Sequence, residues 1–351
     1  MGNCSPKPMR RPPKQSKPLV KASPPAVELH GSDSCPVACR IRVALLYKRV
    51  AVEFVEAAGC AGVPFLRCGS EIMAGSEDSL LRQMDKRFGG PPAAAPATEE
   101  GPWFAKEAAA AEVVTLQHRS MLRHVEGMVR WAVKLAAEGG GEDAGGLGLR
   151  RGRAAEVRRM GKWYGELREI MLEHAQMEER LLFPALDRAA DYEKCRTANE
   201  QHGRDLPIMN GVREDIKSLM AMDAESHLFA EALFNLSLRF KTLQEHCKQH
   251  FEEEEKELLP LLEVAEGARR EEGEEPWPAD LWVEKVAAMM EATHGSLFPF
   301  FMAALLPHDA MRYVELVAGG DDRRAIAMLR LLAAAWETLP RPSWLLSNGT
   351  D

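Results

Sequence analysis

The sequence predicts a mainly α-helical protein in which a small α/β domain precedes an antiparallel four-helix bundle with extra C-terminal helices. Residues 27–90 alternate short apolar runs with two helical patterns. From residue 103 onward, long stretches with apolar residues at helical spacing follow one another, without strand-like alternation. The segment HAQMEERLLFP at 174–184 returns as HFEEEEKELLP at 250–260, which indicates a duplicated helical unit.

The first 26 residues are predicted to be a disordered basic tail, because they are rich in proline and carry lysines and arginines but no acid. Gly2 is the acceptor position for an N-myristoyl group and Cys4 for palmitate, although Pro6 stands where that motif usually has Ser or Thr. Two acyl chains and a basic run together hold a protein at an anionic leaflet. We therefore expect attachment to the cytosolic face of a membrane, such as the plasma membrane.

Charge and composition exclude several classes of function. The formal net charge is −8 although the tail is basic, so the rest of the chain is strongly acidic, and its basic residues are interspersed with acids. This pattern argues against nucleic-acid binding. A secretory signal and a membrane-spanning apolar run are both missing, which predicts a cytoplasmic protein. The seven cysteines are odd in number and contain no CxxC pair, so we expect thiols rather than disulfides.

The segment at 27–90 is predicted to fold as β-α-β-β-β-α. VELH and VAVEFVE alternate like strands and VPFLRC is a compact apolar run, whereas ACRIRVALLYK and SEDSLLRQMDKRF have helical spacing. The proline- and glycine-rich stretch that follows, residues 91–102, is predicted to be a linker.

This segment resembles the N-terminal thioredoxin-like domain of glutathione S-transferases, without that domain's second helix. The resemblance rests on CPVACRIRVALLYK, similar to the family's start of the first helix, and on GVPFL, whose Val63-Pro64 stands where the family keeps a cis-proline. It implies a glutathione site around Val63 and Pro64. It also implies a reactive thiol at Cys35, at a helix N-terminus where the dipole favours thiolate.

One departure from the transferase pattern argues against glutathione binding. The family's Glu-Ser pair, which holds the γ-glutamyl end of glutathione, is reversed here to Ser76-Glu77. A carboxylate therefore stands where the hydroxyl should be. We favour a docking domain that has lost catalysis over a working transferase.

The region 103–266 is predicted to hold the four long helices of the bundle, and 279–339 a helical extension. The glycine-rich stretch 139–153 is expected to be a flexible loop. The four predicted helices cover about 103–138, 154–190, 192–222 and 226–266.

The repeat places one imidazole and one carboxylate on the same side of each of two helices. Positions four residues apart lie about 40° from one another around a helix, so His174 faces the same way as Glu178, and His250 the same way as Glu254. A carboxylate beside an apolar stripe is costly to bury unless something pairs it. A metal ion would pair it.

The other two helices each supply one histidine in a similar setting, His118 in TLQHRSML and His202 in NEQHGRDL. The chain thus reads as a duplicated hairpin with a histidine on the first helix and His-x-x-x-Glu on the second. Four imidazoles and two carboxylates suit two iron ions bridged by the carboxylates, with manganese as the alternative. The predicted metal ligands are His118, His174, Glu178, His202, His250 and Glu254.

Residues 103–266 resemble the hemerythrin family, in particular its HHE cation-binding branch, because the ligand, leucine and proline offsets match in both repeats. The resemblance implies a non-haem di-iron centre. Oxygen-carrying hemerythrins have another histidine where this chain has Leu206, and their last-helix carboxylate corresponds to Glu255, although Glu254 fits the internal repeat better. With four histidines, the resemblance implies oxidation chemistry, sensing or cation binding rather than reversible oxygen carriage.

The remaining histidines are given structural interpretations. His124 lies about 120° around the helix from His118 and is expected at a surface or boundary. His246, one turn before His250, is expected to be a neighbour of the ligands or an alternative ligand. His294 and His308 are expected to cap or pack. The apolar string LFPFFMAALL at 297–306 either packs on the bundle, like the C-terminal helices of plant iron-responsive proteins that it resembles, or forms a partner groove.

Three hypotheses follow. The first is a membrane-tethered metal-binding protein that senses iron or oxygen and redox state, with metal ions, oxygen or peroxide and an unidentified protein as partners. The second is a thiol- or peroxide-linked oxidoreductase that uses the metal centre together with Cys35. The third is an adaptor that keeps both folds without either chemistry.

Overall fold

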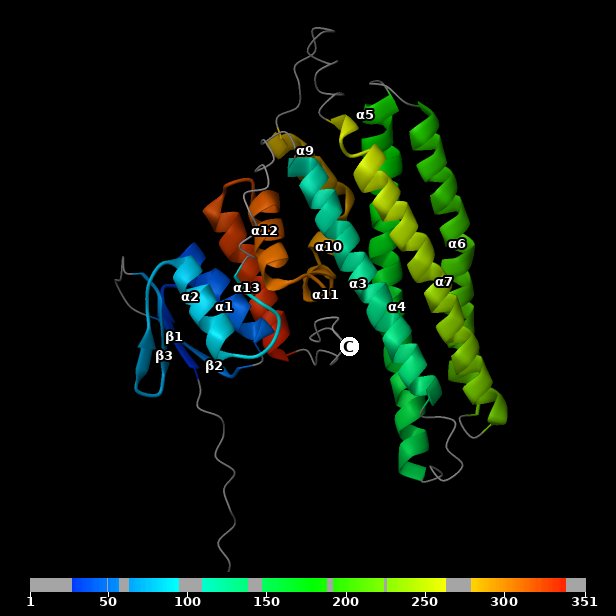
Figure 1. The fold of residues 1–351 in the computed structure, drawn as a ribbon, viewed down its shortest axis with the longest axis horizontal. Coiled ribbons are helices and arrows are strands. Elements are labelled where there is room, and N and C mark those ends of the chain that lie inside the picture. Colours follow the sequence, from blue (N-terminus) through cyan, green and yellow to red (C-terminus); the bar gives the residue numbers. More distant parts are fainter. Residues whose placement is uncertain are drawn as a thin grey trace, which may run out of the picture.

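The computed structural model describes residues 27–48, 50–56, 63–94, 109–137, 147–187, 192–223, 226–262 and 279–338. The predicted lipidation sites Gly2 and Cys4 and most of the predicted linker lie outside these residues. Figure 1 shows an α/β unit at one end, the long helices at the other and the C-terminal helices between them. The predicted fold class, mainly helical with a small α/β unit first, is confirmed.

The α/β unit has the predicted element order. Its four-stranded sheet runs β2-β1-β3-β4, with β1 parallel to β2 and antiparallel to β3, and β4 antiparallel to β3. Leu29 at the centre of β1 pairs with Phe54 and Leu66, and its side chain is fully buried. The elements are β1 Val27–Gly31, α1 Pro36–Tyr47, β2 Val52–Glu56, β3 Phe65–Cys68, β4 Glu71–Met73 and α2 Glu77–Arg87.

The structure corrects one part of the proposed glutathione site and adds evidence on another. The Val63–Pro64 bond, which stands where the transferases keep a cis-proline, is trans. Glu77, at the start of α2, receives two hydrogen bonds from Arg40 at 2.7 and 2.8 Å. The carboxylate at this position is therefore already paired within the protein. Cys35 caps the start of α1 and is partly exposed.

The bundle consists of two antiparallel hairpins, α3 with α4 and α6 with α7, packed as a closed ring of four helices. Helix α4 begins at Leu147, inside the predicted flexible loop, because the leucines and arginines of LGLRRGR favour a helix enough to offset the two glycines. The elements are α3 Ala109–Ala137, α4 Leu147–Met177, α5 Phe183–Asp187, α6 Tyr192–Ala221 and α7 His227–Glu257.

Both His-x-x-x-Glu helices widen directly after the glutamate. A π-helical turn spans Glu178–Leu182, and the N–H of Phe183 donates to the carbonyl of Glu178, five residues back. In the second copy, the N–H of Leu259 donates to the carbonyl of Glu254 at 3.0 Å, again five residues back. In each copy the next residue is proline, which has no N–H and whose ring clashes with the carbonyl four residues back. The repeated proline therefore accounts for the same wide turn beside both glutamates.

The C-terminal helices connect the α/β unit to the bundle. Tyr47 of α1 donates its hydroxyl hydrogen to the carbonyl of Met302 at 2.8 Å and packs edge-on against Trp336. Phe298 and Phe301 of the apolar string are buried, so the string is part of the core and the partner-groove interpretation is wrong. The elements are α9 Ala279–Met289, α10 Glu291–His294, α11 Phe298–Ala303, α12 Pro307–Ala318 and α13 Asp322–Thr338.

The extension also changes the environment of His124, which is buried rather than at a surface. Its ring stacks on Phe300 with 4.1 Å between ring centroids, and its Nε2 hydrogen bonds to the Phe300 carbonyl at 3.0 Å. The described part of the predicted linker, residues 91–94, packs on the α/β unit, where Ala93 and Ala94 are buried and their N–H groups donate to Asp85 of α2. Among the described helices, none is both long and apolar enough to cross a membrane.

Candidate metal centre

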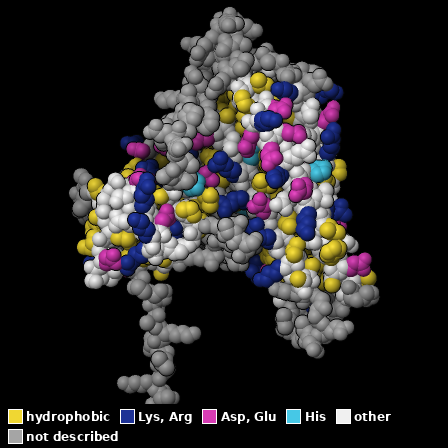
Figure 2. All heavy atoms as spheres, in the orientation of Figure 1, with side chains coloured by type: hydrophobic (Ala, Val, Ile, Leu, Met, Phe, Trp, Pro, Cys, Tyr) yellow, Lys and Arg dark blue, Asp and Glu magenta, His cyan; other side chains and the backbone are white. Residues whose placement is uncertain are grey.

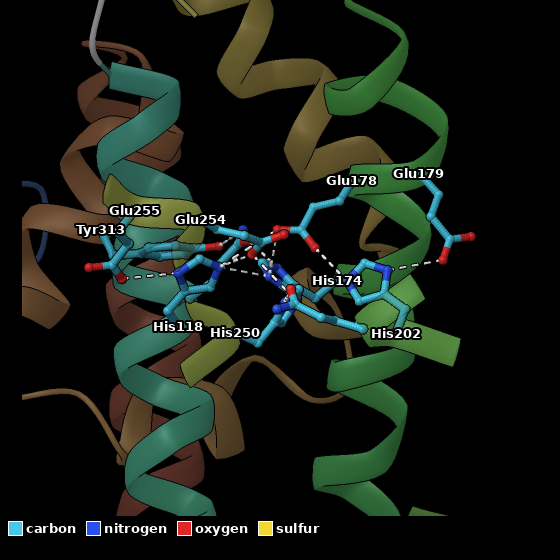
Figure 3. Close-up of polar contacts among 11 residues, drawn as sticks. His118, His174, Glu178, Glu179, His202, His250, Glu254, Glu255 and Tyr313 are labelled. Atoms are coloured by element: carbon cyan, nitrogen blue, oxygen red, sulfur yellow. Dashed lines mark hydrogen bonds and ion pairs between the residues drawn. The ribbon is translucent and has the colours of Figure 1, made fainter. Parts of the chain in front are cut away.

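The six predicted ligands converge at the centre of the bundle from all four long helices (Figure 3). They form two groups that share Glu178 and Glu254: one adds His118 and His174, the other His202 and His250. Within each group the candidate ligand atoms lie within 4.8 Å of one another. The structure therefore brings together every residue that the sequence indicated, with two histidines for each of two positions and two carboxylates between them.

The distances show that each carboxylate faces both positions. Glu178 Oε1 lies 3.0 Å from His174 Nε2, and Glu178 Oε2 lies 3.2 Å from His202 Nε2. Glu254 Oε2 lies 3.5 Å from Nε2 of both His118 and His250. Either carboxylate could therefore contact ions at both positions.

A second layer of residues fixes which ring nitrogen of each histidine faces inward. Each Nδ1 contacts an oxygen of a neighbouring helix: His118 with Glu255 (3.0 Å), His202 with Glu179 (3.0 Å), His174 with Gln117 (3.0 Å) and His250 with Gln201 (2.7 Å). These oxygens accept a hydrogen, so each Nδ1 is the protonated nitrogen and each Nε2 directs its lone pair inward. Metal-binding histidines are held in this way.

The residues that contact the histidine Nδ1 atoms are duplicated in the same way as the ligands. In each hairpin the glutamine that precedes the first histidine holds the histidine of the next helix, and the glutamate that follows each bridging glutamate holds a histidine of the other hairpin. The sequence shows this signal as QH and EE in both repeats, but sequence reasoning assigned these residues no role. Glu255 is thus a partner of His118, and the preference for Glu254 as the inner carboxylate agrees with the structure.

The donor set fits a cation. Glu178 and Glu254 are buried, and none of their four carboxylate oxygens receives a hydrogen bond within the described residues. A buried charge without a partner destabilises a fold by several kcal/mol. Four imidazole nitrogens and two bridging carboxylates are ligands that iron and manganese accept, whereas Ca²⁺ prefers oxygen alone.

Burial and mutual contacts shift the proton affinities of this cluster. Burial disfavours the charged form of His118 and His202, but contacts with Glu178 outweigh it and raise the pKa of both rings. Burial lowers the pKa of His250 to about 3. Burial and the neighbouring Glu178 raise the pKa of Glu254. Metal binding at this cluster must displace protons, so metal affinity is expected to increase as pH rises.

His246 and Leu206 lie at the edge of the cluster. His246 is 44% exposed and contacts Asp205 at 3.1 Å, and it belongs to neither candidate ligand group. The alternative-ligand interpretation of His246 is therefore not supported by its position. Leu206, where oxygen carriers have a histidine, is 41% exposed and lines a cavity beside His202.

This cavity has a volume of about 300 Å³ and reaches His174, His202 and His250, with a mostly apolar lining. The two repeats differ beside this cavity. The residue after His250 is Phe251, which stacks on His118 with 4.2 Å between centroids. The residue after His174 is Ala175, which lines the cavity, and His202 stacks on Phe183 instead, with 5.9 Å between centroids. Among the four ligand histidines, His118 is the one that does not line this cavity.

A second cavity, of about 320 Å³, is lined by residues of α6 and by the C-terminal end of α7. Its lining includes Gln201, Glu253, Glu254 and Glu257, together with Lys194. Carboxylates thus make up a larger part of the lining in this cavity than in the first. Cys35 lies in the α/β unit, which the C-terminal helices separate from the bundle (Figure 1), so the structure does not bring that thiol to the metal cluster.

Comparison with known families agrees with this geometry. Residues 109–262 match the family model of the hemerythrin HHE cation binding domain. This part of the chain is therefore similar to a hemerythrin HHE domain. It contains all six converging residues and ends directly after the second proline-linked wide turn. The HHE match does not extend to the α/β unit or to the C-terminal helices.

The chain is also similar to the zinc finger protein BRUTUS of Arabidopsis thaliana. The two are 21% identical over 165 residues, which is 47% of this chain and 12% of that protein. The similarity therefore concerns a small part of a much longer relative. No solved structure matches the chain.

Proposed function

We propose that this protein binds two iron ions, with manganese as the alternative, and that it serves as a sensor of iron or of oxygen and redox state. The ligands are His118 and His174 at one position, His202 and His250 at the other, with Glu178 and Glu254 as bridges. The observation that supports this most strongly is the pair of buried carboxylates whose oxygens receive no hydrogen bond. The HHE match supports the cation as the missing partner.

Sensing is favoured over oxygen carriage because this chain lacks the fifth histidine that oxygen-carrying hemerythrins have. Leu206 stands where oxygen carriers have another histidine, and it offers no lone pair. Bound iron would supply the redox chemistry, and the protein residues determine what reaches it. The cavity beside His202 is lined by Leu206, Ala175 and Met209, so it admits small neutral molecules such as oxygen or peroxide rather than charged metabolites.

The N-terminal part is proposed to place the sensor. Acylation at Gly2 and Cys4, together with the basic tail, would attach it to the cytosolic face of a membrane. The α/β unit is proposed to be a docking domain of thioredoxin-like origin, since its element order along the chain is the predicted one and Glu77 is engaged by Arg40. A Gly2→Ala variant that stays at the membrane would count against acylation.

The oxidoreductase alternative depends on Cys35 and on glutathione or peroxide. It predicts retention on immobilised glutathione and a thiol-transfer activity that Cys35→Ser abolishes. The separation of Cys35 from the bundle favours the sensor over a single site that uses both groups.

Metal analysis tests the proposal. The full chain, purified after iron supplementation, is expected to hold close to two ions per chain, with iron–iron scattering in X-ray absorption and a coupled pair in Mössbauer spectra. His174→Ala is expected to lose at least one ion. His246→Ala is the matched control, because that exposed histidine lies one turn from His250 and contacts Asp205 instead. Wild-type protein with less than roughly 0.2 ions per chain would contradict the proposal and favour the adaptor hypothesis, since such sites normally stabilise their folds.

A further inference from the structure

The C-terminal helices attach to the first hairpin directly beside its metal ligands. Glu173, which precedes His174 on α4, accepts hydrogen bonds from the backbone N–H groups of Ala292 and Thr293 at 2.8 Å each. Thr293 adds its hydroxyl at 2.7 Å. Helix α10 is thereby fixed to α4 at the level of the cluster.

A row of buried hydrogen bonds runs from His174 into these helices. His174 Nδ1 donates to Gln117 Oε1 at 3.0 Å, and Gln117 Nε2 donates to the Tyr313 hydroxyl oxygen at 3.2 Å. The Tyr313 hydroxyl lies 2.7 Å from His294 Nε2, and His294 Nδ1 lies 2.9 Å from the carbonyl oxygen of Met290. Gln117 and Tyr313 are completely buried, and Figure 3 shows Tyr313 beside the His118 edge of the cluster.

In each hydrogen bond of this row, the neighbouring group determines which atom is the donor. The Met290 carbonyl can only accept, so His294 Nδ1 carries the hydrogen and its Nε2 accepts from Tyr313. Burial lowers the pKa of His294, which favours this neutral ring, and burial raises the pKa of Tyr313, which keeps its hydroxyl protonated. Because Tyr313 donates to His294, its oxygen accepts from Gln117, whose own oxygen must then face His174. The row ends with a hydrogen on His174 Nδ1 and a lone pair on Nε2.

The second hairpin reaches the same result with different residues. His250 Nδ1 donates to Gln201 Oε1 at 2.7 Å, and Gln201 Nε2 donates to Glu253 at 2.5 Å. Glu253 also accepts from Gln249 at 2.8 Å. All of these residues belong to the hairpin itself, and Glu253 is a partly exposed carboxylate. The C-terminal helices thus take part in holding one histidine pair and not the other.

We propose that Tyr313 is a positioning residue for the metal site at His118 and His174, and that it couples occupancy of this site to the docking of the C-terminal helices. This rests on the proposed metal function. A metal ion on His174 Nε2 favours the tautomer that the row imposes, so binding of the ion and docking of α10–α12 stabilise each other. Such coupling is reciprocal: whatever loosens these helices weakens metal binding at this position. The C-terminal helices would then report the state of one of the two ions.

The test compares Tyr313→Phe with Ser120→Ala in the full chain. Ser120 donates its hydroxyl hydrogen to the carbonyl of Phe301 at 2.7 Å, so Ser120→Ala also removes one buried hydrogen bond between α3 and the extension, but not one in the row. Co²⁺ is titrated against a competing chelator, and hydrogen exchange of residues 291–318 is measured with and without Co²⁺. In the Tyr313→Phe protein, one of the two affinities is expected to fall by roughly tenfold or more, as for other partners of metal-bound histidines.

The weakened position is identified in a His202→Ala background, where the remaining strong site is the one at His118 and His174. Tyr313→Phe is expected to weaken Co²⁺ binding there as well. Wild type and Ser120→Ala are expected to show slower exchange in 291–318 when Co²⁺ is bound, and Tyr313→Phe to lose most of this difference. Should Tyr313→Phe fail to fold, His294→Leu interrupts the same row, and His294→Gln, which keeps an acceptor for Tyr313, is expected to restore the affinity.

The outcomes separate the two proposals. If the wild type takes up no Co²⁺ or iron, the metal function and the coupling both fail. If the wild type binds two ions and Tyr313→Phe binds them with the same affinities, the coupling alone is overturned. The same holds if the hydrogen-exchange rates of residues 291–318 do not change when the metal binds. An equal loss of affinity in Ser120→Ala and Tyr313→Phe would also overturn it, because a general loosening of the extension would explain both.

Discussion

His124 offers a measure of how firmly the C-terminal helices cover the bundle. The side chain is 1% exposed, stacked on Phe300 and hydrogen-bonded to that residue's carbonyl. Burial lowers its pKa from 6.5 to about 3. The folded protein therefore keeps this ring neutral at a pH where the unfolded chain protonates it, which makes folding dependent on pH.

The direction and size of the pH dependence of stability follow from the pKa of His124 in the unfolded and folded states. Above pH 6.5 the ring is neutral in both states and contributes no pH dependence. As pH falls from 6.5 toward about 3, only the unfolded state gains the proton, so stability is lost. Each pH unit in this window costs about 1.4 kcal/mol, which amounts to about 2 kcal/mol at pH 5.

The variant His124→Gln tests this prediction, because glutamine still donates to the Phe300 carbonyl but does not titrate. Urea unfolding of metal-free wild type and variant is measured at pH 8, 6.5 and 5. The difference between the two proteins is expected to be constant from pH 8 to about 7 and then to shift by about 2 kcal/mol in favour of the variant at pH 5. Groups common to both proteins cancel in this difference. Parallel pH profiles for the two proteins down to pH 5 would refute the buried, neutral ring and the covered face that it implies.

Two further changes examine the cavity and the interface between the units. Leu206→Trp is expected to fill the apolar cavity and slow the aerobic oxidation of the iron-loaded protein several-fold in stopped-flow absorption; an unchanged rate at full metal content would show that small molecules arrive by another route. Tyr47→Phe removes the buried hydrogen bond to Met302 and is expected to cost about 1–2 kcal/mol in urea unfolding while metal content stays the same; unaltered stability would mean that this contact does not hold the units together.

The sequence was sufficient to predict the convergence of the six histidine and glutamate side chains, because its signal is local and repeated. A four-residue spacing on a helix determines that His174 and Glu178 share a side, whatever surrounds them. The same holds for His250 and Glu254. Duplication then made two histidines on the other helices recognisable as partners. The element order of the α/β unit was readable for a related reason, since alternation and helical spacing are properties of short segments.

Features that depend on distant residues were missed. His124 was placed at a boundary because its position around α3 points away from His118, and only the docking of α11 makes that side interior. The pattern of the apolar string at 297–306 also fits a groove, but α3, α4 and α13 pack against it. The role of Gln117 depends on Tyr313, which lies 196 residues away in the chain. Tertiary contacts at such separations leave no periodic trace in the sequence.

The duplication separates the features that the two proposed metal positions share from those that make them different. Both copies keep the His-x-x-x-Glu spacing and the proline that widens the turn. Both also keep the glutamine and the glutamate that contact the histidine Nδ1 atoms. These features orient the ligand side chains. They diverge at Ala175, which lines the cavity, and at Phe251, whose ring stacks on His118. They diverge again in the partner of the glutamine: Gln201 donates a hydrogen bond to Glu253, whereas Gln117 donates one to Tyr313. Because Glu178 and Glu254 face both positions, a molecule that reacts beside His202 would alter the charge felt at His174. On the proposed metal function, chemistry in the cavity and docking of the C-terminal helices would therefore be coupled through the same two carboxylates.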